Sequence, residues 1–287
     1  MQFTFINEES TSQPLKSFLL KQGISHRLYS QLKHWPDNFM VNGQLTTAAA
    51  VINFHDQVQI TLPAEADDPQ VATSFAPLKI IYEDNNWLVI DKPAYLSSVP
   101  GPSNRTDTVV NRVKGHWEKQ HEQNMVPHII TRLDRDTQGL MLIAKHRLAN
   151  IWANQQIAQH QIQKLYYALV SGNLTADHGI IDQPIGRPEN SIAHQVLSNG
   201  QAARTEYWVL ERLEQTTLVK VKLHTGRTHQ IRVHFKYLGH PLVGDHLYGG
   251  PLDLGFEHQA LQAYYLQFWD QFQQTTRSFE LKQCLIE

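Results

Sequence analysis

A charged loop between residues 131 and 140 holds the side chains best suited to chemistry in this sequence. It reads TRLDRDTQGL and leads into an apolar stretch over residues 140–144. The loop carries two carboxylates and two guanidinium groups, on Asp134, Asp136, Arg132 and Arg135. Charges that adjoin a buried strand are costly unless they pair with one another or take part in a reaction. One of these carboxylates is therefore the first candidate for a reactive group.

The loop belongs to a large C-terminal domain, which we expect to cover residues 79–287. A helix is expected over residues 146–160, and another begins near Thr228 and stops at Gly239. Many strands with few regular crossover helices are typical of the α+β class, so we expect a mixed, largely antiparallel sheet with flanking helices and loops. Apolar runs predict strands at residues 79–82, 87–90, 140–144, 165–170, 205–210 and 218–223.

A smaller N-terminal unit is predicted over residues 1–62. Apolar residues with helical spacing predict a helix from Leu15, and Ser25 is placed to cap a second short helix. An asparagine-glycine turn signal and an alternating strand over residues 58–62 complete the unit. Residues 63–78 contain proline and acidic residues without a clear period, so we expect a linker there.

The composition favours a globular protein in a reducing compartment. Of the 287 residues, 41% are hydrophobic and 18% are charged, which allows a large core and argues against disorder. The lone Cys284 can form no internal disulfide, and no Cys/His cluster has zinc-finger spacing. The sequence has no signal-peptide pattern and no apolar run near the ~20 residues that span a bilayer. We expect a cytoplasmic protein without a metal or a membrane partner.

Charge is segregated along the chain. The net charge of −2 argues mildly against a nucleic-acid partner. However, residues 63–91 hold six acids and one base, a net of −5, whereas residues 128–170 hold five bases and two acids, a net of +3. Residues 204–240 hold seven bases and three acids, a net of +4. Basic segments therefore surround the candidate loop, and a nucleic-acid partner remains compatible with the sequence.

Several segments of the large domain resemble the RNA pseudouridine synthases of the RluA type. The order and spacing of the similar segments agree over nearly the whole chain. Residues 14–62, with the Gly-Ile-Ser-His-Arg and Val-Asn-Gly runs, resemble the S4 RNA-binding module, a small α/β unit that often precedes that domain. The segments that carry the resemblance are Ile80–Pro93, the Arg-Leu-Asp-Arg-Asp-Thr loop, Lys164–Val170 and Leu223–His234.

The resemblance implies isomerisation of uridine in RNA, with no cofactor and no metal. Asp134 matches the catalytic aspartate, which either attacks C1′ or takes a proton from C2′. Both routes need an ionised carboxylate, and Arg232 matches the arginine that is expected beside it. Tyr166 matches the active-site tyrosine. Because alternate residues of a strand face opposite sides, Tyr167 is then expected to point away from the pocket.

The resemblance also implies contacts with RNA. Arg227 precedes a helix start, where backbone amides and the helix dipole favour an anion, and phosphate contact competes with an ordinary surface role. Lys92 is expected first to serve the structure and only second to touch RNA. The full set of expected RNA-binding residues is Arg132, Arg227, His229, Gln230, Lys92, Arg27 and Lys33.

Two alternatives stay open at this point. A non-catalytic RNA-binding protein could keep the fold, and Thr131 and Gln138, which depart from the family pattern, would be its early signs. A hydrolase could use Asp134 and Asp136 as an acid–base pair, although the arginines beside Asp136 would keep it a poor proton donor. By analogy we expect ribosomal RNA as the substrate before transfer RNA, no DNA partner, and a monomer.

Overall fold

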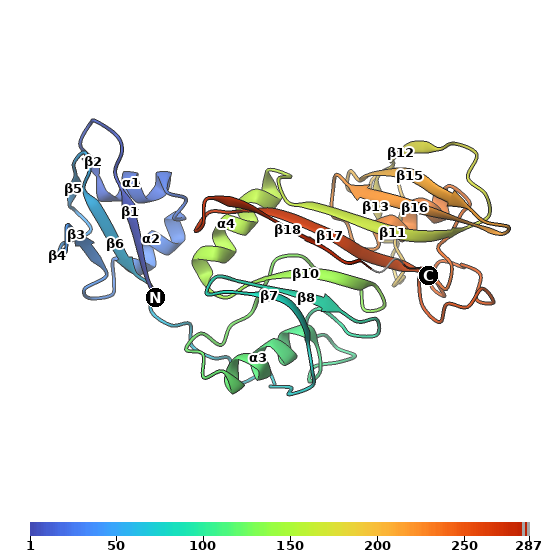
Figure 1. The fold of residues 1–287 in the computed structure, drawn as a ribbon, viewed down its shortest axis with the longest axis horizontal. Coiled ribbons are helices and arrows are strands. Elements are labelled where there is room, and N and C mark those ends of the chain that lie inside the picture. Colours follow the sequence, from blue (N-terminus) through green and yellow to red (C-terminus); the bar gives the residue numbers. More distant parts are fainter. Residues whose placement is uncertain (283–284, 286–287) are drawn as a thin grey trace.

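The computed structural model describes residues 1–282 and residue 285, and Cys284 lies outside the described residues. A small N-terminal unit and a larger domain follow one another along the long axis of the molecule (Figure 1). No helix of the described residues is long and apolar enough to cross a membrane.

The N-terminal unit combines two short helices with a four-stranded antiparallel sheet of order β1-β6-β3-β4. Both predicted helices are present, and the Ser25 hydroxyl accepts the Leu28 N–H at 3.1 Å, as a cap should. Strand β1, which pairs with β6, was not predicted. The elements are β1 (Gln2–Ile6), β2 (Gln13–Pro14), α1 (Leu15–Lys21), α2 (His26–Leu32), β3 (Phe39–Val41), β4 (Gln44–Leu45), β5 (Val51–Ile52) and β6 (Gln57–Thr61).

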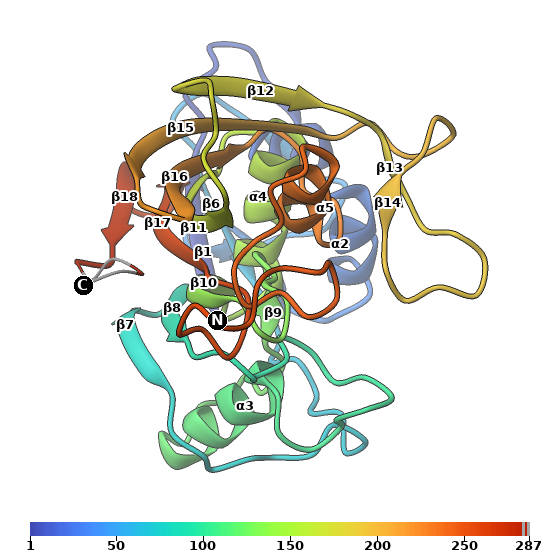
Figure 2. The ribbon, with the colours of Figure 1, turned by 90° about the vertical axis from the view of Figure 1, so that its right-hand side faces the viewer.

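The large domain is built on one large sheet. Figure 2 shows it from the side that lies to the right in Figure 1. Its strand order is β12-β15-β16-β11-β17-β10-β8-β7, with β18 on β17 and β9 on β10. The elements are β7 (Lys79–Glu83), β8 (Trp87–Lys92), α3 (Val109–Lys119), β9 (His128–Ile129), β10 (Gln138–Ala144), α4 (Arg147–Ala158), β11 (Gln163–Ser171), β12 (His178–Asp182), β13 (Ile185–Gly186), β14 (Gln195–Val196), β15 (Arg204–Arg212), β16 (Thr216–Leu223), α5 (Gln230–Tyr237), β17 (Leu261–Asp270) and β18 (Thr275–Glu280).

One parallel contact joins the two halves of this sheet. Strand β10 pairs with β17 in parallel at Gln138 and Gly139, while the other strand pairs of the sheet are antiparallel. Gly139 has φ +116°, and a Cβ there would lie 2.3 Å from the Ala263 carbonyl oxygen. Only glycine fits this approach, which fixes where the charged loop re-enters the sheet. The predicted α+β class with a largely antiparallel sheet is confirmed.

The predicted strands of the large domain are all present, with longer bounds. Helix α3 was missed, although Thr108 and Asn111 form a capping box at its start. Strand β17, ten residues long, was also missed. Residues 63–78 contain no helix or strand, yet they lie along α3. Lys114 Nζ of α3 donates to the Val71 carbonyl, and Asn111 Nδ2 donates to the Ala72 carbonyl.

The N-terminal unit shares a hydrophobic core with helix α4 of the large domain. Leu148 and Trp152 of α4 pack among the buried residues of α1, α2 and β6. Trp152 is 6% exposed, and its Nε1 donates to the Gln22 carbonyl at 3.1 Å. The ring of Phe272 lies 4.5 Å from that of Trp152 and extends this core toward the large sheet. The small unit is therefore held by apolar packing as well as by the connecting chain.

Replacing Trp152 by alanine should lower the free energy of unfolding by about 3 kcal/mol, because a buried aromatic side chain is lost and a cavity remains. Urea denaturation measures the change. Trp269, which is 39% exposed, provides the matched control, and its replacement should cost less than about 1 kcal/mol. Equal losses for the two variants would show that Trp152 does not join the units.

Candidate active site

Asp134 lies in a cavity of about 520 Å³ between the two halves of the large sheet. Its walls come from the charged loop, residues 97–99, the segment that starts α5, and strands β11 and β17. The lining residues that matter below are Arg132, Asp134, Tyr166, Arg227, His229, Gln230 and Arg232. The Asp134 side chain is 26% exposed, so a molecule in the cavity can reach its carboxylate.

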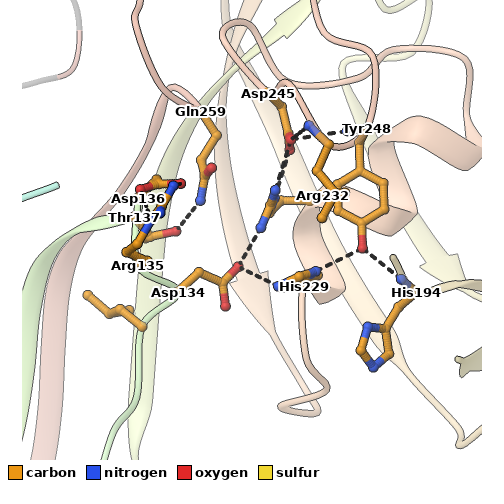
Figure 3. Close-up of polar contacts among 12 residues, drawn as sticks. Asp134, Arg135, Asp136, Thr137, His194, His229, Arg232, Asp245, Tyr248 and Gln259 are labelled. Carbon is orange, nitrogen blue, oxygen red and sulfur yellow. Dashed lines mark hydrogen bonds and ion pairs between the residues drawn. The ribbon is translucent and has the colours of Figure 1, made fainter. Parts of the chain in front are cut away.

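Arg232 connects Asp134 to a second, buried carboxylate. Its Nη1 donates to Asp134 Oδ2 at 3.1 Å, while its Nε and Nη2 donate to the two oxygens of Asp245 at 2.7 and 2.9 Å. Figure 3 shows this chain of contacts. When two N–H groups of a guanidinium donate to the two oxygens of one carboxylate, the planar group is fixed, and so are the directions of its remaining N–H groups. Asp245 thus orients Arg232 toward Asp134. Arg232 lies beside Asp134, as the sequence predicted.

Asp245 is itself fixed by a tight turn. Its side chain has no exposed surface, and Oδ1 also accepts the backbone N–H groups of Leu247 and Tyr248 at 3.2 Å each. Sequence reasoning missed this residue. The available signal was an acid in the run Val-Gly-Asp-His-Leu-Tyr-Gly, where apolar residues and glycines surround it. A buried acid needs a cation, and Arg232 on α5 supplies it.

The charge of Arg232 is maintained inside the protein. Burial lowers the pKa of Arg232, but the hydrogen bonds and negative charges of Asp245 and Asp134 outweigh burial and raise it above its usual value. The guanidinium also lies 4.8 Å from the centre of the Tyr248 ring. A permanent positive charge therefore stands next to the Asp134 carboxylate.

Tyr166 and Tyr167 lie on opposite faces of β11. Tyr166 is 4% exposed and lines the cavity with Asp134. Tyr167 stacks on Tyr264, with ring centroids 3.8 Å apart. Burial, and then the charge of Asp134, raise the pKa of Tyr166 well above its ordinary value. Tyr166 is therefore a neutral phenol that offers an aromatic face and an O–H group, and it is a poor base.

Lys92 is fully buried behind the charged loop. Its ammonium donates to the carbonyls of Pro93, Leu96 and Arg135 at 2.8, 2.8 and 2.9 Å. Burial lowers the pKa of Lys92 to about 7, against the opposing charges of Asp136 and Asp134. This placement gives Lys92 a structural part in the loop and no surface for the predicted RNA contact.

The start of α5 contains the other predicted residues of this corner. Arg227 is exposed, and its Nε donates to the Ala202 carbonyl at 2.9 Å. Gln230 is buried. Its Nε2 donates to Thr205 Oγ1 and to the Arg204 carbonyl, and its Oε1 accepts from Thr225 Oγ1 and from the Arg227 N–H. Gln230 thus orders the turn. Arg227 presents its remaining N–H groups at the cavity mouth.

His229 and Arg132 both line the cavity that contains Asp134. His229 Nε2 lies 3.9 Å from Asp134 Oδ2, and its Nδ1 lies 2.9 Å from the Tyr248 hydroxyl. Arg132 is exposed and has no ion-pair partner among residues 1–282 and 285. Asp136 pairs with Arg135 at 2.7 Å and does not line the cavity, so the structure does not support an acid–base pair of Asp134 with Asp136.

Arg27 and Lys33 lie outside the cavity. Both are exposed, on α2 and at its C-terminal end, in the N-terminal unit. Thr131, which departs from the family pattern, has a structural contact: its Oγ1 accepts the Leu142 N–H at 2.8 Å. No group of three or more His, Cys, Asp or Glu side chains could hold a metal ion within the described part of the chain.

Comparison with known proteins agrees with this fold. The structure of human RNA pseudouridylate synthase domain containing 1 superimposes with a TM-score of 0.61 at 24% identity, over 73% of this chain and 85% of that one. This likeness concerns the fold, which is that of the pseudouridylate synthase domains.

The sequence comparisons define the family. The RNA pseudouridylate synthase profile matches residues 86–237. The uncharacterized RNA pseudouridine synthase YjbO of Bacillus subtilis is 38% identical, over 88% of this chain and 89% of its own length. The ribosomal large subunit pseudouridine synthase D of Vibrio parahaemolyticus is 36% identical, over 83% and 78%. The chain therefore belongs to the RNA pseudouridine synthase family, enzymes that isomerise uridine in RNA.

Replacing Lys92 by methionine should lower the free energy of unfolding by about 3 kcal/mol or more, because three carbonyls in or near the interior lose their donor. Denaturant unfolding gives the value. Lys79, whose side chain is 70% exposed in its pair with Asp91, is the control, and Lys79→Met should cost less than about 1 kcal/mol. A Lys92→Met protein as stable as the parent would contradict the anchoring role.

Proposed function

We propose that this enzyme converts uridines of large-subunit ribosomal RNA to pseudouridine and that Asp134 is its catalytic carboxylate. The observation that carries the assignment is the Asp245–Arg232–Asp134 series of contacts, which ends in the one carboxylate among the described residues that lines the cavity. Relatives over most of the chain, in Vibrio parahaemolyticus and Vibrio cholerae, bear the name ribosomal large subunit pseudouridine synthase D, which supports the choice of RNA.

The reaction breaks the N1–C1′ bond, turns the uracil, and joins its C5 to C1′, while the C5 hydrogen is released. A uridine within a duplex must first leave the stack, at a cost of a few kcal/mol. Tyr166 provides an aromatic surface for the extruded base. Asp134 acts on the sugar as a nucleophile at C1′ or as a base at C2′, and a deuterium isotope effect at C2′ separates the two routes.

The N-terminal unit supplies a further RNA contact in this proposal. Arg27 and Lys33 are exposed on and after α2, and neither has an ion-pair partner among the described residues. The shared core with α4 holds α2 in a fixed position relative to the large domain. Because these two cations are held in place, they can select RNA whose phosphate backbone contacts both α2 and the large domain.

Asp134→Asn should abolish isomerisation and leave RNA affinity within about threefold of the parent, because the amide keeps the shape and loses the charge. The release of tritium from RNA labelled at uridine C5 measures turnover. Sites of pseudouridine in cells with and without the protein identify the target. Full turnover by the variant would refute the assignment of Asp134. If pseudouridines disappear only from transfer RNA in cells without the protein, the choice of ribosomal RNA is refuted.

Arg27→Gln with Lys33→Gln should weaken RNA binding and lower the slope of log K against log salt by about 2, since each phosphate contact releases about one counterion. A matched double variant, Lys16→Gln with Lys21→Gln, changes the same charge on α1, where Lys21 already pairs with Glu9 at 2.6 Å. Its slope should stay near that of the parent. The same slope for both double variants would leave α2 without a role in binding.

A further inference from the structure

The Tyr248 hydroxyl has two polar neighbours with different chemistry. Tyr248 is 2% exposed. Its oxygen accepts the backbone N–H of His194 at 3.0 Å and lies 2.9 Å from Nδ1 of His229 (Figure 3). A backbone N–H can only donate, so His194 uses a lone pair of the hydroxyl oxygen. Among the described residues, His229 Nδ1 is thus the acceptor available to the hydroxyl proton.

This arrangement selects one tautomer of His229. If Nδ1 carried a hydrogen, the buried Tyr248 hydroxyl would be left without an acceptor, which is unfavourable for a buried polar group. If Nδ1 is bare, the hydroxyl donates to it and the ring hydrogen resides on Nε2. Nε2 is the atom that lies 3.9 Å from Asp134 Oδ2. An N–H facing a carboxylate is favourable, whereas a lone pair facing it is not. Both ends of the ring therefore favour the same tautomer.

The Asp134 carboxylate is held from one side. Arg232 Nη1, at 3.1 Å, and His229 Nε2, at 3.9 Å, both approach Oδ2. Oδ1 has no hydrogen-bond or ion-pair partner within residues 1–282 and 285. Arg232 already donates to this oxygen, and a hydrogen bond from His229 Nε2 to the same oxygen would further restrain rotation of the carboxylate about its Cβ–Cγ bond. Oδ1 is then left free to face the ribose.

We propose that His229 is a positioning residue for the reaction: Tyr248 fixes its imidazole as the Nε2–H tautomer, and this N–H together with Arg232 holds Asp134 Oδ2 so that Oδ1 is the reacting atom. The 3.9 Å separation shortens to a hydrogen bond when substrate fills the cavity, as contacts of free active sites commonly do. The role rests on Asp134 being the catalytic carboxylate, as proposed above.

The surroundings of His229 favour the neutral ring that this role requires. Burial lowers the pKa of His229, and the charges of Arg232 and His194 act in the same direction, while Asp134 and Asp245 oppose them. An imidazolium would carry a hydrogen on Nδ1 and would remove the acceptor of Tyr248. The neutral form keeps that contact.

The backbone of His229 allows a matched pair of variants. His229 has φ +56° at the N-terminal end of α5, a left-handed conformation that asparagine tolerates well. Asparagine reaches only as far as Nδ1 and has no group at the Nε2 position. Glutamine extends one atom further and can present an amide N–H where Nε2–H lies. The two amides therefore separate the presence of a side chain from the presence of the donor.

The tautomer can be measured without RNA. In ¹⁵N-histidine-labelled protein, the signals of the two ring nitrogens show which one carries the hydrogen, and the His229 signals are those that vanish in His229→Asn. We expect the Nε2–H form in the parent and a mixture of tautomers in Tyr248→Phe. An Nδ1–H form in the parent, or an unchanged pattern in Tyr248→Phe, would overturn the proposal.

Turnover of C5-tritiated ribosomal RNA gives the second test. His229→Asn should lower kcat about 10- to 100-fold with KM within about threefold, because the carboxylate loses its alignment and not its access to substrate. His229→Gln should recover most of kcat. His178→Asn, on the exposed outer strand β12, should match the parent.

The outcomes separate this proposal from the proposed function. Parent-like kcat in His229→Asn, or equal loss in the asparagine and glutamine variants, would overturn the positioning role while the enzyme still modifies ribosomal RNA. A rise in KM without a fall in kcat would overturn it as well, and would make His229 an RNA contact. An inactive parent on ribosomal RNA would instead reject the choice of substrate, and the tautomer measurement would still decide the role of Tyr248.

Discussion

One guanidinium shared between two carboxylates is the interaction on which the site depends. Arg232 is buried, and so is Asp245, which takes two of its donors at 2.7 and 2.9 Å. A buried ion pair gives little net stability, but removing either partner is costly, so the pair fixes geometry. Its remaining N–H group reaches Asp134 at 3.1 Å. The position of the Asp134 carboxylate in the cavity thus follows from a buried ion pair between two other residues.

The sheet supplies the frame for this pair. The charged loop enters β10 at Gly139, where the backbone of β17 approaches too closely for any side chain. Lys92 connects the same loop to the segment after β8, because its ammonium donates to the carbonyl of Arg135 and to those of Pro93 and Leu96. Helix α5 carries Arg232 from the other half of the domain. The proposed catalytic residues Asp134 and Arg232 therefore come from elements 98 positions apart in the sequence, and the sheet brings them together.

Local patterns in the sequence predicted the parts that are locally determined. The strand around Trp87, the helix from residue 146 and the Ser25 cap follow from apolar spacing and capping chemistry. Strand β17 was missed although it forms a local hairpin with β18, and its pairings with β11 and β10 are non-local and leave no local signal. Asp134, Tyr166 and Arg232 were predicted from motif similarity, whereas Asp245 was not, because its partner is 13 residues away on another element. Burial of Lys92 also depends on contacts that no local pattern reveals.

The most direct test of the account removes the cation without leaving a buried charge unpaired. In the double variant Arg232→Gln with Asp245→Asn, an amide pair replaces the ion pair, and Asp134 loses its positive neighbour. The kcat of isomerisation by this variant should fall about 100-fold, because Asp134 loses the N–H donor that approaches its Oδ2 at 3.1 Å. A kcat equal to that of the parent would contradict the central role of Arg232.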